Sequence, residues 1–184
     1  MPVWGIILAV VIVVLVVYII SAYNSLVKKR NSCEEAFATM DVYLKQRWDT
    51  VPNFVEIVKG YAKHEAETLN NIVSLRTRSY DSMSTNEKIE ANKQLSQGLG
   101  KLFAVAEAYP DLKASANYQD LSNKLETVET HIANARKYYN ASVRELNNAV
   151  EVFPKVIIAK MFGFTKMQMF EIDAKERQNV EVKF

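Results

Sequence analysis

The chain begins with an uninterrupted apolar run and then changes to a repeating pattern of apolar and polar positions. The run extends from Trp4 to Tyr23 and contains no charged residue and no proline. A helix rises about 1.5 Å per residue, so this run spans roughly 30 Å, the thickness of the hydrocarbon core of a bilayer. Backbone groups in lipid must pair within their own segment, so the many Val and Ile residues are expected to be helical here, although they favour strands in water. The pattern predicts a membrane-spanning helix over residues 4–23.

The residues that flank this run predict its orientation. Trp4 at one end and Tyr18 and Tyr23 at the other suit the two membrane interfaces, and the basic residues 28–30 follow directly. The positive-inside rule therefore places residues 1–3 outside and the C-terminal part in the cytoplasm. A cleaved signal would need basic residues before the apolar core and a small-residue cleavage site, and the sequence has neither. A buried helix of a soluble protein is the competing interpretation.

Beyond Tyr23 the apolar positions recur every three or four residues, which is the spacing of an amphipathic helix. The members of this stripe are Leu26, Cys33, Phe37, Met40, Leu44, Trp48, Val51, Val55, Val58, Ala62, Leu69 and Ile72. Pro52 interrupts the segment, and a proline inside a helix removes one backbone hydrogen bond and kinks or breaks the helix. Because the apolar spacing does not shift across Pro52, we expect one long kinked helix from the membrane to about Ser79. A hairpin broken at Pro52 is the alternative.

A second helix is predicted after a short polar segment. Ser84 or Thr85, followed by Glu87, is typical of a helix N-terminus, because the hydroxyl caps the free backbone amides of the first turn. The helix is expected to continue to about Ala108, since Pro110 disfavours helical backbone at the residue before it.

The third helix has the most regular pattern in the chain. Five consecutive heptads of apolar residues extend over about 117–152 and predict one continuous buried stripe. Phe153 and Pro154 end it. The Met- and Phe-rich segment 155–170 is expected to return as a short fourth helix, which either covers the end of the bundle or exposes an apolar patch to a partner or a membrane surface. Residues 173–184 are expected to form a loosely held tail.

Composition supports this all-helical organisation. Five Gly and four Pro provide few residues for strands and tight turns. The roughly 150 residues from 24 to 172 are enough for one domain with its own core. The net charge of +2 argues against a nucleic-acid-binding face, and a single cysteine allows no internal disulfide. We therefore expect one cytoplasmic domain that binds no nucleic acid.

The candidate catalytic and metal-binding residues are few. His64-Glu65 is the nearest match to a metalloprotease motif, but Thr68 stands where the second histidine is required, so the site would lack a ligand. Cys33 lies on the apolar stripe, where a buried thiol is inert, and His131 lies beside the third helix's stripe. No phosphate-binding loop and no serine nucleophile elbow is present in the sequence. We expect no catalytic residue, no cofactor and no metal site.

Three groups of residues are candidates for interaction instead. Tyr109, Pro110, Asp111 and Lys113 form a polar segment between helices that can present an acidic and a basic group together, although the same residues can simply end one helix and begin the next. Arg136 and Asn140 lie four residues apart on one helix face and can pair with groups on the first helix. Phe162 and Phe164 belong to the apolar segment 155–170.

Several blocks, in this order, resemble the LemA family. They are Tyr23-Asn24 with Leu26-Val27, Arg30-Asn31, Asp41 with Leu44, Arg47 and Asp49, Pro52-Asn53, Val58-Lys59-Gly60-Tyr61 with His64-Glu65, residues 107–113 (EAYPDLK), Glu129, Ala135-Arg136 with Tyr138-Tyr139-Asn140, Phe153-Pro154 and Phe162-Gly163-Phe164. The resemblance covers essentially the full length. It implies a bacterial single-pass membrane protein with an outside N-terminus and a cytoplasmic antiparallel helical bundle, and it implies little about molecular function.

Together these features predict an all-α protein with a transmembrane helix and an elongated antiparallel bundle of three long helices and one short helix. We expect a non-enzymatic scaffold or adaptor of the bacterial inner membrane, which contacts the lipid bilayer through residues 4–23 and binds partner proteins. A heptad stripe can be buried within one chain or between chains, so a homo-oligomer is also expected. The alternative function is an accessory or regulatory subunit of a membrane peptidase or of an envelope-stress system.

Overall fold

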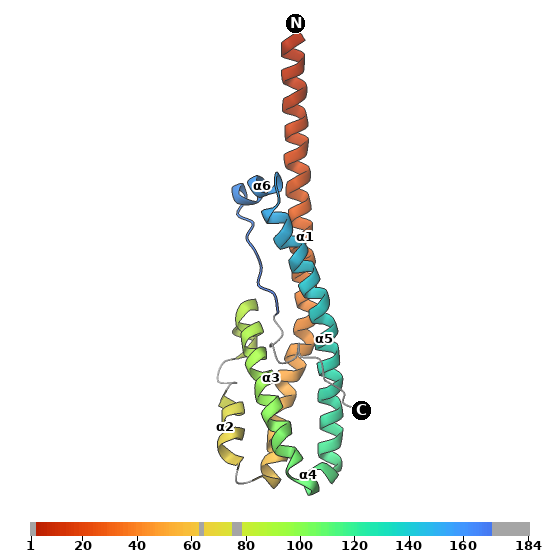
Figure 1. Ribbon diagram of the computed structural model, residues 1–184, viewed down its shortest axis with the longest axis vertical. Helices are drawn as coiled ribbons and strands as arrows, with labels where there is room; N and C mark the ends of the chain where they lie inside the picture. Colours follow the sequence, from red (N-terminus) through yellow and green to blue (C-terminus); the bar gives the residue numbers. More distant parts are fainter. Residues whose placement is uncertain (1–2, 63–64, 75–78, 171–184) are drawn as a thin grey trace, which may run out of the picture. The chain divides into compact units, whose positions relative to one another are not determined.

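The computed structural model describes residues 3–62, 65–74 and 79–170, and within these ranges no residue is in a strand. The helices are α1 (Val3–Tyr61), α2 (Ala66–Ser74), α3 (Thr85–Glu107), α4 (Pro110–Ala114), α5 (Ala116–Glu151) and α6 (Lys155–Met161), with a 3₁₀ turn η2 (Tyr80–Ser82) before α3 (Figure 1). The predicted all-α class is confirmed. The chain divides into two compact units, and α1 and α5 each contribute to both.

Unit 1 contains the described part of residues 1–36 and 138–184. Within it, residues 3–17 of α1 are exposed along their whole length, and the first buried residue of α1 is Ala22. Lys155 contacts Ser25 and Glu145 contacts Lys29, so α5 and α6 follow α1 in the opposite direction. The core of this unit consists of Leu26, Cys33, Ala36, Tyr139, Val143, Leu146, Val150, Ile158 and Ala159.

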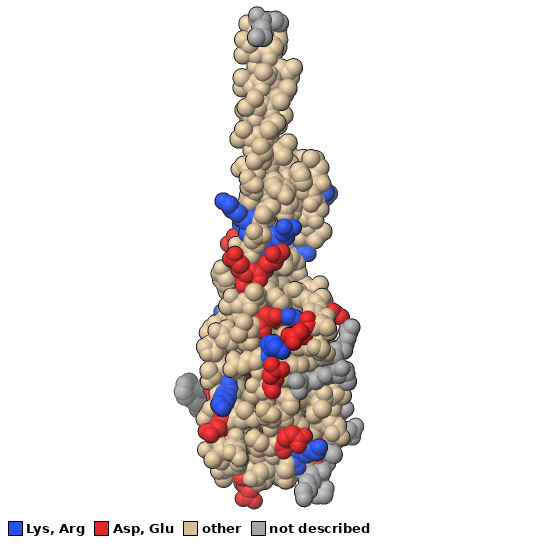
Figure 2. All heavy atoms as spheres, turned by 180° about the vertical axis from the view of Figure 1, so that it is seen from behind, with Lys and Arg blue, Asp and Glu red and all other residues tan. Residues whose placement is uncertain are grey.

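One helix of the described residues is long and apolar enough to cross a membrane, and this helix is α1. None of its apolar window is buried within the fold. Figure 2 shows no charged side chain on this part of α1, whereas groups of Lys, Arg, Asp and Glu side chains lie among uncharged ones on the parts of the chain that follow it. The sequence-based prediction of a candidate membrane helix is therefore supported by its exposure in the fold.

Unit 2 contains residues 37–137. Its core joins the C-terminal part of α1 to α3 and to the N-terminal part of α5. Phe54 lies 5.2 Å, between ring centroids, from both Phe103 on α3 and Tyr118 on α5. The α3 helix begins with a capping box in which Ser84 and Glu87 each bind the other's backbone amide, so that Ser84, and not Thr85, is the N-cap of the two that the sequence offered.

The first helix is continuous at Pro52, so the question that the sequence left open is answered. A proline in a helix interior costs about 3 kcal/mol. Val51, Phe54 and Val55, on either side of it, are all at most 1% exposed, and their burial offsets this cost.

The expected extension of this helix to Ser79 is wrong, because α1 ends at Tyr61 and α2 is a separate helix. Gly60, in the last turn of α1, lowers helix propensity by about 1 kcal/mol. Leu69 and Ile72 continue the apolar spacing of α1, but they are buried on α2, which packs against α3. The spacing therefore predicted correctly that Leu69 and Ile72 are buried, but it did not predict that the chain reverses its direction before them.

This reversal changes the direction of α3. Asp41 contacts Lys88 and Arg47 contacts Ser96, and Phe54 contacts Phe103, so α3 follows α1 in the same direction. In unit 2, α5 is thus antiparallel to α1 and α3. The described residues contain three short helices, α2, α4 and α6, where a single one was expected.

The expected fourth helix over 155–170 is also shorter than predicted. The α6 helix ends at Met161, and residues 164–170 form an extended segment without regular secondary structure. Two further predictions lie outside the described residues, namely the placement of His64 and the loosely held tail over 173–184.

Candidate functional sites

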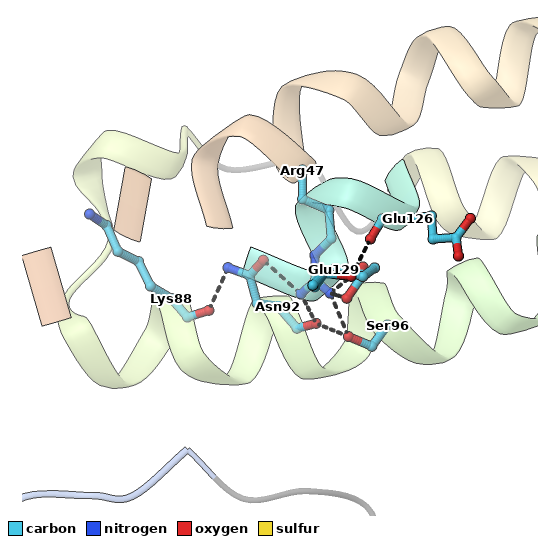
Figure 3. A network of polar contacts seen from close by, with 7 residues as sticks. Arg47, Lys88, Asn92, Ser96, Glu126 and Glu129 are labelled. Carbon is cyan, nitrogen blue, oxygen red and sulfur yellow. Dashed lines mark hydrogen bonds and ion pairs between the residues drawn. The ribbon is translucent and has the colours of Figure 1, made fainter. Parts of the chain in front are cut away.

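A buried arginine lies at the centre of unit 2 (Figure 3). The side chain of Arg47 is 1% exposed. Its Nη1 donates hydrogen bonds to both carboxylate oxygens of Glu129, at 2.7 and 2.9 Å, and to Ser96 Oγ at 2.9 Å. Its Nη2 donates to the carbonyl oxygen of Asn92 at 2.9 Å and to Asn92 Oδ1 at 3.1 Å. One side chain of α1 is therefore bonded to both α3 and α5.

These hydrogen bonds offset the free-energy cost of burying the charged guanidinium. An isolated buried charge costs several kcal/mol, and a hydrogen-bonded carboxylate offsets that cost. Glu129 is 41% exposed, so it contacts both Arg47 and solvent. The Nε of Arg47 has no partner in the part of the chain that the structure describes. The network fixes the register of three helices.

Arg47 and Glu129 both belong to the blocks that resemble the LemA family, but the sequence analysis did not select either as a candidate site residue. A usable signal was present, because Arg47 lies three residues after Leu44 and four before Val51, so it falls on the buried stripe of α1. A charged residue inside such a stripe predicts a buried ion pair.

A second polar cluster in unit 2 surrounds Tyr80. The Tyr80 hydroxyl donates to Asp41 Oδ1 at 2.6 Å, and Lys88 Nζ forms an ion pair with Asp41 Oδ2 at 2.6 Å. The Lys88 ammonium also lies 4.8 Å from the centroid of the Tyr80 ring. Burial, together with the Asp41 carboxylate, raises the pKa of Tyr80 far above its usual value. The phenol therefore remains a neutral donor that ties the η2 turn to α1.

In unit 1, the turn after α6 positions two aromatic side chains. Gly163 has φ +71°, a left-handed conformation that favours glycine, and the Phe164 amide donates to the Ala159 carbonyl at 2.9 Å. This is the hydrogen bond of a glycine-terminated helix end. Phe162 and Phe164 lie on either side of the glycine. The Phe-Gly-Phe block is therefore the sequence of this helix end.

These two phenylalanines contact α1 where its apolar run ends. The Tyr23 ring lies 4.8 Å from the ring of Phe162 and 5.8 Å from that of Phe164, between centroids. The Arg30 guanidinium lies 5.5 Å from the centroid of the Phe164 ring. Aromatic pairs at these separations add about 0.5–1.5 kcal/mol beyond their burial. Of the predicted interaction residues, Phe162 and Phe164 are thus the two that the fold brings together.

The extended segment that follows is held to α5 by two asparagines. Asn147 Nδ2 donates to the Met167 carbonyl at 3.0 Å and its Oδ1 accepts from the Met167 amide at 2.9 Å. Asn140 makes the same pair of bonds with the backbone of Phe170, at 2.9 and 2.8 Å. Each asparagine side chain therefore makes the pair of backbone hydrogen bonds that a neighbouring strand makes in a sheet. The sequence analysis named Asn140 as a residue that can pair with the first helix, and its side-chain hydrogen bonds in the fold are to the backbone of Phe170.

Tyr139 adds a third bond to the same segment. Its hydroxyl donates to the carbonyl of Gln168 at 2.8 Å, and the side chain is fully buried. Burial, followed by the nearby Cys33 thiol, raises the pKa of Tyr139 to about 12. The phenol is accordingly a neutral donor at all physiological pH values.

The remaining predicted residues lie in unit 2. Pro110 is the first residue of α4, and Tyr109 caps that helix with its backbone alone. Lys113 Nζ forms an ion pair with Glu107 Oε2 at 2.6 Å, and this hydrogen bond raises the pKa of Lys113. Asp111 is exposed. Arg136 is half-buried on α5. The fold thus places Arg136 in unit 2 and Asn140 in unit 1.

The second histidine makes an aromatic contact. His131, on α5, is stacked on Tyr43 with ring centroids 4.8 Å apart and planes 8° apart. Across residues 3–62, 65–74 and 79–170, no group of three or more His, Cys, Asp or Glu side chains is positioned to hold a metal ion.

Comparison with known proteins gives consistent matches. The model of the LemA family matches residues 36–184. Protein LemA of Metamycoplasma hominis is 25% identical over 159 residues, which are 86% of this chain and 73% of that protein. Magnetosome protein MamQ of Magnetospirillum gryphiswaldense is 32% identical over 72 residues, which are 39% of this chain and 26% of that protein. Magnetosome protein MamQ 2 of Paramagnetospirillum magneticum is 22% identical over 186 residues, covering 87% of this chain and 68% of that protein.

Proposed function

The chain belongs to the LemA family, and on this premise we propose that it is a non-enzymatic scaffold or adaptor that is anchored in the bacterial inner membrane and organises other proteins there. The observation that carries the proposal is the exposure of residues 3–17 of α1, an apolar surface that no other part of the described chain covers. In water such a surface is strongly unfavourable, and in lipid it is favoured.

The anchor crosses the membrane once, with the N-terminus outside and both units' soluble helices in the cytoplasm. Residues 28–30 are Lys, Lys and Arg, and they follow the apolar run within one to two helical turns. Basic residues next to a membrane helix favour the cytoplasmic side.

The scaffold role is supported by how the buried polar groups are used. Arg47, Tyr80 and Tyr139 each hold one segment of the chain to another through hydrogen bonds, in the ways described above. Such groups stabilise a defined helical surface that can bind other proteins. Binding of further copies of the same chain is part of this proposal.

Membrane insertion is tested with one charge in the middle of the apolar run. Val13→Asp is expected to move the full-length chain from the membrane fraction to the carbonate-soluble fraction, because Asp near the bilayer centre costs about 2.5–3.5 kcal/mol. Val42→Asp is the matched control, since Val42 is 64% exposed in unit 2, and this variant is expected to stay in the membrane. Equal extraction of both variants would contradict the anchor.

The scaffold role is tested by the composition of the complex extracted from membranes in a mild detergent. Native mass spectrometry of the full-length chain is expected to give complexes of several identical chains. A reproducible, stoichiometric peptidase or envelope-stress protein would favour the accessory-subunit function instead. A strict monomer without a partner would contradict both.

A further inference from the structure

The outward face of α6 and its N-terminal flank form an apolar patch on unit 1. Its members are Val152, Phe153, Ile157, Met161 and Phe162, which are between 49% and 76% exposed. The opposite face of α6 is buried, with Ile158 5% exposed and Ala159 1% exposed. The short helix therefore has two apolar faces, and only one of them packs against the rest of unit 1. A soluble surface does not commonly expose five large apolar side chains within one segment as short as residues 152–162.

The position of α6 along α1 indicates what covers this patch. Phe162 packs on Tyr23, the last residue of the apolar run, and Lys155 Nζ lies 3.2 Å from Ser25 Oγ. Figure 1 shows α6 beside α1 at this place. Ser25 is two residues beyond the run, or about 3 Å along the helix axis. If residues 4–23 lie in lipid, α6 lies at the boundary between acyl chains and headgroups.

Basic residues near the patch have the sign that this boundary attracts, and the acidic Glu151, next to Val152, is paired with Lys166. Lys28 follows the apolar run and Lys160 lies on α6, and both are exposed. Neither lysine has an ion-pair partner among the residues that the structure describes, whereas Lys29 is paired with Glu145. A shallow hollow of about 720 Å³ on α1 is lined by apolar Val17 and Ile20 at one end and by Lys28 at the other. A phospholipid likewise has apolar acyl chains at one end and a charged headgroup at the other.

We propose that residues 152–162 are a second membrane contact, in which α6 lies in the headgroup region of the leaflet that α1 leaves, with Lys28 and Lys160 binding the phosphates of anionic phospholipids. An interfacial helix typically buries its apolar face about 5–10 Å into this region. The contact is continuous with the exposed apolar surface of α1. It fixes the rotation of unit 1 against the bilayer, which a single helix cannot do. This inference depends on the membrane anchor proposed above.

The experiment measures the depth of single nitroxide labels on the full-length chain in vesicles of phosphatidylcholine and phosphatidylglycerol. Cys33→Ala supplies the background, and the labelled variants are Ile157→Cys and Met161→Cys. Val10→Cys reports the anchor and Val42→Cys reports an exposed aliphatic position in unit 2. The ratio of oxygen accessibility to accessibility of a water-soluble nickel chelate is expected to be several-fold higher at residues 10, 157 and 161 than at 42.

The outcomes separate the two proposals. A low ratio at residue 10 contradicts the anchor itself. A high ratio at residue 10 with ratios at 157 and 161 equal to that at 42 overturns the second membrane contact alone. Labels at 157 and 161 that neither reagent reaches, with spin–spin broadening, overturn it in favour of a second copy of the chain on this patch.

The proposed contacts of Lys28 and Lys160 with lipid phosphates are tested by changing the lipid and by substituting the two lysines. In vesicles of phosphatidylcholine alone, the ratio at residue 157 is expected to fall, and Lys28→Gln with Lys160→Gln is expected to lower it in the mixed vesicles too. A ratio that depends neither on the anionic lipid nor on these lysines overturns the phosphate contacts. Circular dichroism of each labelled variant verifies that the helices are intact.

Discussion

The two compact units of this chain bury polar groups in different ways. Unit 2 encloses the charged Arg47 and supplies a carboxylate for it, whereas unit 1 buries the neutral side chain of Tyr139 and holds its extended segment with Asn140 and Asn147. Removing the partner of a buried charge costs about 3–5 kcal/mol, and removing a neutral hydrogen-bond partner costs about 1–3 kcal/mol. The ion pairs of the unit that carries the candidate membrane helix, such as Lys29–Glu145, are partly exposed, whereas the other unit depends on one ion pair of a buried arginine.

The largest expected effect comes from removing the carboxylate in unit 2. Glu129→Ala leaves Arg47 buried without its counter-charge and is expected to lower the free energy of unfolding of unit 2 by about 3 kcal/mol, the lower end of the range because Glu129 is partly exposed. Urea unfolding in detergent, followed by fluorescence of the buried Trp48 in a Trp4→Phe background, measures this change.

Glu126→Ala is the matched control, since Glu126 is exposed on the same helix, and it is expected to change stability by less than about 0.5 kcal/mol. An equal effect of the two substitutions would mean that Arg47 does not require the carboxylate, and the contrast between the units would be lost.

The next effect is confined to unit 1. Asn147→Ala removes both hydrogen bonds to the backbone of Met167 and is expected to cost about 2 kcal/mol of local stability. Hydrogen exchange should become faster at the amide of Met167, without a change in the unfolding followed by Trp48. Asn148→Ala, the exposed neighbour, is the control and should leave this exchange rate unchanged. Faster exchange throughout unit 2 would show that the segment is not a local element.

Tyr139 makes unit 1 sensitive to alkaline pH. The pKa of Tyr139 is about 12 in the folded chain, compared with about 10 for an unfolded tyrosine. Between these values the folded state retains a proton that the unfolded state has released, so its stability falls as pH rises. The contribution is complete below pH 10 and is lost as the pH approaches 12.

Absorbance of the phenolate at 295 nm, recorded with urea unfolding at increasing pH, follows this loss. Tyr139→Phe is expected to remove one phenol from the late titration step and to cost about 1 kcal/mol at neutral pH, the value of one hydrogen bond. Tyr138→Phe, which changes the adjacent exposed phenol, should retain the late step. A late step of unchanged amplitude in Tyr139→Phe would assign it to other residues and contradict this prediction.

The smallest effects are a pair of glycine substitutions with opposite signs. Gly163→Ala places a side chain at φ +71° and is expected to destabilise the end of α6 by about 1 kcal/mol. Gly100→Ala, in α3, meets no atom within 4 Å and is expected to stabilise unit 2 by about 0.5–1 kcal/mol through higher helix propensity. Thermal unfolding by circular dichroism distinguishes them, and equal signs would contradict the assigned conformations.

The apolar pattern predicted the all-α class because it records which positions are buried on a helix. It also predicted α5 almost to the residue, and the polar residues before α3 predicted a helix start at Ser84 or Thr85, since both depend on neighbours in sequence. It did not predict the reversal between α1 and α2, because Leu69 and Ile72 continue the same spacing after the chain changes direction. Local patterns of burial contain no information about direction.

The candidate sites were predicted less completely. Phe162 and Phe164 were selected as an apolar pair, and the fold places both on Tyr23. Arg47 and Asn147 were not selected, because their roles depend on partners 82 and 20 residues away. Contacts of this kind require the tertiary arrangement, and a single sequence shows only that a polar residue lies on a buried face.

The central claim is that residues 4–23 cross the inner membrane with the soluble helices in the cytoplasm. The most direct test labels Val42→Cys, in the Cys33→Ala background, with a membrane-impermeant thiol reagent in spheroplasts that express the full-length chain. The account predicts no labelling in intact spheroplasts and complete labelling after they are opened. Labelling of intact spheroplasts would place the soluble helices outside the cell and contradict the account.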